Sequence, residues 1–113
     1  MTVQEKLDLI IATIDDMKGE DIQILDVREK TSIADYFVVC SASNDRLLSA
    51  IADRVDEKLK EHKERPLRRE GGSNGWILHD YGDIILHVMR DEQRQFYDLE
   101  TLWRTMQTNP DVL

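Results

Sequence analysis

The sequence has a single cysteine, Cys40, and no apolar run that approaches the ~20 residues needed to cross a membrane. One cysteine excludes an internal disulfide and fits a reducing compartment. The first residues, MTVQE, form neither a basic-then-apolar signal peptide nor an arginine-rich transit peptide. We therefore expect a cytoplasmic protein with no membrane association.

Basic residues are also scarce, because 15 Lys and Arg stand against 23 Asp and Glu and the net charge is −8. Binding to RNA or DNA depends on Lys and Arg that neutralise phosphates. The densest basic stretch, Lys58 to Arg69, is interrupted by Glu61 and Glu64, which indicates a solvated helix end. We expect a protein partner with a basic surface and no direct binding of nucleic acid.

The length of 113 residues predicts one domain, which we place at residues 1–106, with a frayed tail at 107–113. Apolar residues at helical spacing predict helices over 3–17, over 47–59 with a cap within 41–44 and an end before Pro66, and from Asp91 to about Met106. Predicted strands are 21–27, 36–41, 66–69, 76–80 and 84–89. This order predicts an α/β domain in which about three helices pack against a mixed sheet.

Local patterns make four sharper predictions. Thr2 and Glu5 have the spacing of a capping box, and Gly19 stands where a left-handed residue would end the first helix. The strand 21–27 has apolar residues on both faces and should be covered on both sides. The apolar run 36–41 is typical of a central strand that is buried on both faces.

Few residues offer catalytic or metal-binding chemistry. Cys40 lies inside the apolar run and is predicted to be a small, buried core residue. His79 and His87 would face each other across the predicted hairpin if both point the same way; strand histidines held by hydrogen bonds are the alternative. The sequence contains no H-x-x-x-H and no C-x-x-C motif. We therefore predict no metal and no cofactor.

The most informative segment is residues 76–88, WILHDYGDIILHV, which predicts two apolar strands joined by a tight turn. With DYF at 35–37 and YDLETLW at 97–103, this segment resembles the Iojap family, the ribosomal silencing factors. The matching residues run in order from about Asp21 to Trp103. The resemblance implies a fold related to the nucleotidyltransferases.

The resemblance also implies a partner. Members of the family bind the large ribosomal subunit through its protein number fourteen on the intersubunit face, and they block small-subunit joining and so repress translation. Carried over to this chain, the docking surface would comprise Trp76, Leu78, Asp80, Tyr81 and Asp83. Trp76 would be the apolar anchor, the two aspartates would meet basic side chains, and Tyr81 would pack at the rim.

The residues taken alone leave these roles open. Trp76 could equally fill the core, and Asp80 and Asp83 could serve the backbone of an ordinary turn. In the predicted last helix, Arg94, Tyr97, Glu100 and Trp103 match the family, and we expect them to hold that helix to the sheet. The family forms homodimers when free, on which the sequence gives no evidence.

Enzyme activity is the main alternative, because the implied fold is that of nucleotidyltransferases. Their chemistry needs a glycine-serine turn before a helix and two carboxylates at alternate strand positions to hold metal ions. Here SASN at 41–44 stands where the family usually has Ser-Gly-Thr-Ser, so Ala42 removes the glycine. The glycine-rich loop 71–75 lacks the Lys-Ser/Thr ending of a phosphate loop. We predict a non-enzyme, with a cryptic enzyme and a large-subunit assembly factor as the alternatives.

Overall fold

The computed structural model describes residues 1–98 and 101. The helices are α1 (Val3–Asp16), α2 (Asp45–Lys60) and α3 (Asp91–Tyr97), and the strands are β1 (Glu20–Asp26), β2 (Tyr36–Ala42), β3 (Arg68–Gly71), β4 (Trp76–Asp80) and β5 (Ile84–Arg90). The predicted order of elements is confirmed. The predicted frayed tail at 107–113 lies outside the described residues.

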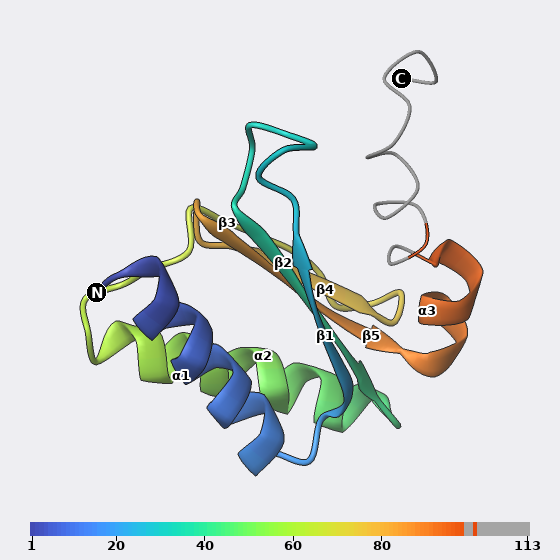
Figure 1. Ribbon diagram of the computed structural model, residues 1–113. Coiled ribbons are helices and arrows are strands. Elements are labelled where there is room, and N and C mark those ends of the chain that lie inside the picture. The colour runs from blue at the N-terminus through green and yellow to red at the C-terminus, as the bar shows by residue number, and fades with distance from the viewer. Residues whose placement is uncertain (99–100, 102–113) are drawn as a thin grey trace.

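The five strands form one mixed sheet in the order β1-β2-β5-β4-β3. Only β2 and β5 run parallel, while the other three neighbouring pairs are antiparallel. Helices α1 and α2 lie side by side against one face of the sheet, and α3 lies by the opposite face (Figure 1). The α/β prediction of a mixed sheet with three helices in one domain is therefore confirmed.

A hydrophobic core lies on each side of this sheet. On the side of α1 and α2, Val38 and Cys40 of β2 pack with Ile10 and Ile51 of the helices. On the other side, a smaller core forms around Phe37 and neighbouring residues (Leu25, Val27, Ala34, Val39, Ile85 and Met89). Two cores explain the continuous apolar run of β2, because a central strand must satisfy both faces.

The ends of α1 show one confirmed prediction and one error. The capping box is present: Thr2 Oγ1 accepts from the Glu5 N–H at 3.1 Å, and the Thr2 N–H donates to Glu5 Oε1 at 2.8 Å. At the other end the left-handed residue is Lys18, with φ 66°, and the predicted position at Gly19 is wrong by one. The Gly19 N–H donates to the Ile14 carbonyl at 2.9 Å, which closes a Schellman motif.

The burial of the first strand and the boundaries of two other elements also differ from the predictions. Ile24 is 45% exposed, so the first strand is not covered on both sides there, since β1 is an edge strand with a bulge. The short edge strand begins at Arg68 and not at Pro66. Helix α3 ends at Tyr97, where Asp98 takes a left-handed conformation, and most of the rest of the predicted helix, to about Met106, lies outside the described residues.

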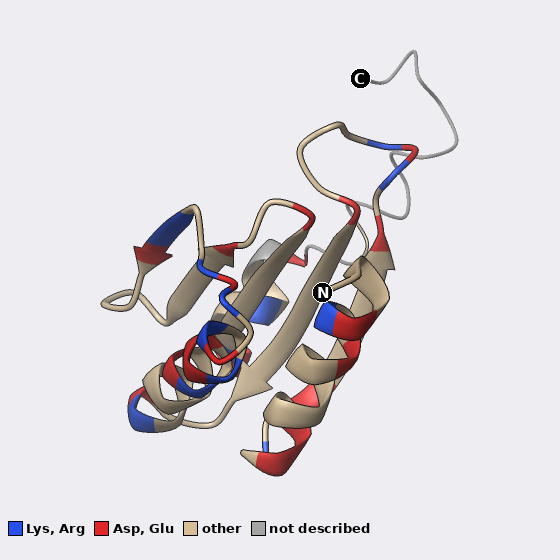
Figure 2. Cartoon of the chain, turned by 90° about the vertical axis from the view of Figure 1, so that its left-hand side faces the viewer, with Lys and Arg blue, Asp and Glu red and all other residues tan. Residues whose placement is uncertain are grey.

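Charge is unevenly spread over the outer side of the helices. Acidic residues predominate along α1, whereas both signs alternate along α2 (Figure 2). Within α2 and just after it, ion pairs join Arg54 to Glu57 and Lys58 to Glu61. The basic stretch that the sequence contains is therefore interleaved with acids, as predicted. None of the helices in the described residues is long and apolar enough to cross a bilayer.

Gly19 is expected to be intolerant of a side chain. A Cβ there would lie 2.4 Å from Ile14 Cγ2, so we predict that Gly19→Ala lowers the free energy of unfolding by about 1–3 kcal/mol. Lys18→Gly is the matched control, since it relieves the left-handed residue and should raise stability by up to about 1 kcal/mol. Urea denaturation measures both, and an unchanged Gly19→Ala midpoint would contradict this account.

Candidate protein-docking surface

Strand β4 presents its residues alternately to the two faces of the sheet. Ile77 packs into the core beneath α1 and α2, whereas Trp76 and Leu78 lie on the opposite face against the smaller core. Asp80 follows on that same face because side chains alternate along a strand. All three are half-buried, while Ile77 and His79 between them are buried. This row is the part of β4 that a partner can reach.

Edge strand β3 extends the row with two charged residues. Glu70 pairs with Leu78 in the register, and Arg68 pairs with Asp80. Both are exposed, and they form an ion pair of 3.4 Å. A shallow hollow of about 270 Å³ lies between Glu70, Trp76 and Leu78. We call the five residues Arg68, Glu70, Trp76, Leu78 and Asp80 the β3–β4 surface.

Trp76 is held from below by His87 of β5. Its indole Nε1–H donates to His87 Nδ1 at 3.1 Å, and the two ring centroids lie 5.8 Å apart. The His87 ring also meets Phe37, with centroids 5.0 Å apart. Trp76 is thus neither free on the surface nor a core residue, which resolves the question that the sequence left open.

Tyr81 does not belong to this surface, and its predicted place at an exposed rim is wrong. It is only 5% exposed and lies in the core on the side of α1 and α2. Its hydroxyl shares a hydrogen bond of 3.2 Å with His79 Nδ1, and burial raises the pKa of the phenol. The Tyr81 N–H donates to the Ile84 carbonyl within the turn, and the Tyr81 side chain points toward the core on the side of α1 and α2.

Asp83 faces the helices as well. Lys6 Nζ of α1 contacts Asp83 Oδ1 at 2.9 Å and Glu64 Oε2 at 3.3 Å. Burial acts to lower the pKa of Lys6, but hydrogen bonding to Asp83 and the charges of both acids outweigh it, so the pKa is raised. Asp83 therefore holds the turn to α1. Asp80 also serves the turn, because its Oδ1 accepts the Gly82 N–H at 2.8 Å.

The two strand histidines cannot share a metal ion. His79 lies opposite Leu86 in the register and His87 lies opposite Leu78, so their side chains point to opposite faces. The hydrogen-bonded alternative is correct for both. Within the described residues, no group of three His, Cys, Asp or Glu is arranged to hold a metal. Cys40 is buried as predicted, and burial raises the pKa of its thiol to about 12.

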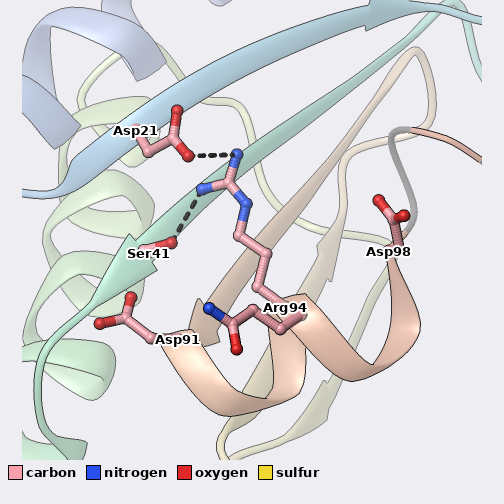
Figure 3. A pocket seen from close by; sticks show the side chains of 6 residues that line it. Asp21, Ser41, Asp91, Arg94 and Asp98 are labelled. Atoms are coloured by element: carbon pink, nitrogen blue, oxygen red, sulfur yellow. Dashed lines mark hydrogen bonds and ion pairs between the residues drawn. The ribbon is translucent and has the colours of Figure 1, made fainter.

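A second hollow, of about 440 Å³, lies beside Ser41 near the end of β2. Its residues are drawn in Figure 3: Asp21, Ser41, Asp91, Arg94, Gln95 and Asp98. The buried Arg94 guanidinium reaches across it, donating to Ser41 Oγ at 2.8 Å and pairing with Asp21 at 3.6 Å. Arg94 thus holds α3 to the sheet, as predicted. The Tyr97 side chain, Glu100 and Trp103 lie outside the described residues.

Comparison with known proteins places the chain in a family. A family model described as "ribosomal silencing factor during starvation" matches residues 1–112. The chain belongs to this family. A ribosomal silencing factor from Chromobacterium violaceum is 38% identical over 91% of this chain and 85% of its own length. The resemblance seen in the sequence is therefore confirmed.

A solved structure and a more distant relative extend the comparison. The crystal structure of a Chromobacterium violaceum protein superposes with a TM-score of 0.87, at 38% identity, and covers 91% of this chain and 87% of that one. A mouse protein named "mitochondrial assembly of ribosomal large subunit protein 1" is 29% identical over 95% of this chain but 48% of its own length. The family name describes a silencing factor and not an enzyme.

His87 should make stability depend on pH. Burial lowers its pKa to about 4 from an ordinary value of 6.5. The neutral folded form therefore contributes its full stability above about pH 6.5, and that contribution is lost as the pH falls toward 4. Between about pH 7 and 4, we predict that the wild type loses up to about 3 kcal/mol more than His87→Leu in urea denaturation. Parallel curves would contradict the burial of a neutral histidine.

Asp83 should matter for folding. We predict that Asp83→Asn lowers the free energy of unfolding by about 1–3 kcal/mol, because the buried Lys6 loses one of its two carboxylates. Asp80→Asn is the control, since its amide oxygen can still accept the Gly82 N–H. Equal stability of both variants in urea would show that the contact to Lys6 contributes nothing.

Proposed function

We propose that this protein silences ribosomes by binding the large subunit and blocking the small subunit from joining it, which lowers translation. Its partner would be a basic protein of the intersubunit face, the large-subunit protein number fourteen. Membership of the silencing-factor family supports this proposal. The observation that carries it is the row Trp76, Leu78 and Asp80 on a sheet face that α1 and α2 leave open. The protein would act in the same compartment as the ribosomes that it binds.

The β3–β4 surface has the composition of a docking site. Half-buried Trp76 and Leu78 offer an apolar centre next to a hollow, and large aromatic residues supply much of the binding energy at interfaces. Glu70 and Asp80 flank this centre and can meet lysine or arginine side chains. The net charge of −8 would further steer the protein toward a basic partner.

Tyr81 and Asp83 would support this surface indirectly. Tyr81 fills the core beneath the hairpin, and Asp83 holds the turn to Lys6. Because both residues point to the helix side, we propose that the partner contacts the row on β4 and not the turn residues behind it. The proposed docking surface therefore differs from the five residues taken from the resemblance, because Arg68 and Glu70 replace Tyr81 and Asp83.

Blocking of subunit joining needs only that the bound protein occupies space. The described part of the chain has extents of 41 × 33 × 21 Å, so a copy bound on the intersubunit face would keep the facing surfaces of the two subunits apart. No chemistry is required at the interface. A steric mechanism also needs no open substrate pocket. It is therefore compatible with the Arg94 side chain reaching across the hollow near the end of β2.

An assembly role is the second candidate, and the name of the mouse relative favours it. A factor that binds immature large subunits could use the same β3–β4 surface without blocking subunit joining. The two functions differ in one measurable respect. A silencing factor inhibits the association of purified mature subunits, whereas an assembly factor binds large subunits and leaves their association unchanged.

Trp76→Glu combined with Asp80→Lys is expected to weaken binding to large subunits at least about a hundredfold, because it places charge at the apolar centre and reverses charge at its edge. Cosedimentation measures the binding. Light scattering of purified subunits measures their joining, which the wild type should inhibit with saturation near one copy per large subunit and which the double variant should not inhibit.

Ile24→Glu combined with Asp26→Lys is the matched control. It introduces the same charges on β1, at the opposite edge of the sheet, where both side chains are exposed. This control should bind and inhibit like the wild type. Retained binding by a folded Trp76→Glu, Asp80→Lys protein would rule out the β3–β4 surface as the docking site.

A further inference from the structure

His87 occupies an unusual position for a histidine, directly beneath the docking surface proposed above. It lies on central strand β5, is only 4% exposed, and packs between Trp76 on β4 and Phe37 on β2. Its Nδ1 accepts the indole N–H of Trp76 at 3.1 Å. No step of the docking described so far uses this residue.

The hydrogen bond to Trp76 fixes the protonation state of the ring. An indole nitrogen can only donate, so Nδ1 must be the unprotonated acceptor and the proton of the neutral ring sits on Nε2. Nε2 is buried and has no hydrogen-bond partner in the part of the chain that the structure describes. A buried donor without an acceptor is unfavourable. A leucine here would avoid that disadvantage, so the contribution of the histidine lies in its Nδ1.

The surroundings of the ring keep it neutral. On the same face of the sheet, β2 presents Phe37 and Val39, and β4 presents Trp76 and Leu78. Ile85 and Met89 flank the ring along its own strand. None of these side chains is titratable or charged. The acceptor at Nδ1 is therefore present throughout the neutral pH range.

We propose that His87 is a positioning residue for partner binding, which holds the Trp76 indole in one orientation by accepting its N–H. This hydrogen bond adds to the packing that restrains rotation about the two side-chain bonds of the tryptophan. Fixing it before the partner arrives lowers the entropy lost on binding. This inference rests on the proposed function, because it assigns a role within the same docking surface.

The orientation of the indole also restricts which side chains of a partner can contact Trp76. Tryptophan has a single hydrogen-bonding atom, and here that atom is directed to His87. The part of the ring that is exposed is apolar. The partner group that meets it must therefore be an apolar side chain or the aliphatic stem of a lysine or arginine, whose charged end can reach Glu70 or Asp80.

A double-mutant cycle tests the proposal through binding to purified large subunits. We expect His87→Leu to bind about fivefold more weakly than the wild type, the size of one ordinary hydrogen bond. His87→Asn should bind nearly like the wild type, because Asn Oδ1 can accept at the position of Nδ1. In a Trp76→Phe background, where no N–H remains, His87→Leu should cause no further loss. An equal loss in that background would overturn the proposal.

Nuclear magnetic resonance tests the positioning without the ribosome. The chain has two tryptophans, so two indole N–H signals are expected, and Trp76→Phe identifies the one from Trp76. We expect this signal to shift in His87→Leu and to stay near its wild-type place in His87→Asn. An unmoved signal in His87→Leu would overturn the proposal. If even the wild type fails to bind large subunits, the proposed function fails, and a shifted signal would then leave His87 holding Trp76 for another partner.

Discussion

The pairing of β5 with β2 on one side and with β4 on the other is the constraint on which the β3–β4 surface depends. Every residue from Ile84 to Met89 is buried, so β5 serves both hydrophobic cores along almost its whole length. Its antiparallel register with β4 then decides which β4 side chains face outward. A shift of one residue would turn Trp76 and Leu78 inward and bring Ile77 and His79 out. The position of the proposed docking surface thus follows from the core.

Periodicity predicted most of the fold because its signals are local. The apolar run at 36–41 identified β2, and the spacing of Thr2 and Glu5 identified the start of α1. Predictions failed where long-range contacts decide the outcome. Asp83 is drawn to Lys6, which lies 77 residues away in sequence, and no local pattern reports that contact. Gly19 failed differently, since its role is close packing on Ile14 and not a left-handed backbone.

The candidate site was also predicted only in part, because local patterns indicate some of its residues and long-range pairing decides the others. Alternation along a strand places Trp76, Leu78 and Asp80 on one face, which the sequence alone could indicate. The role of His87 needed the hairpin register, in which even-numbered residues of β4 lie opposite odd-numbered residues of β5. With that register, His79 and His87 must face opposite sides. The length of the turn between Asp80 and Ile84 is the signal that could have shown this.

The hairpin of β4 and β5 separates two requirements that usually compete, one on each face of the sheet. Behind the sheet, Asp83 pairs with Lys6 and Tyr81 packs into the larger core, so this side of the turn contributes to stability. In front, Trp76 is held by a histidine whose Nε2 has no partner among the described residues, so this side gives up some stability for orientation. Because the sheet lies between them, a change in front need not weaken the contacts behind. This arrangement lets a small domain carry a partly exposed apolar row on one face of the sheet while its larger core lies on the other.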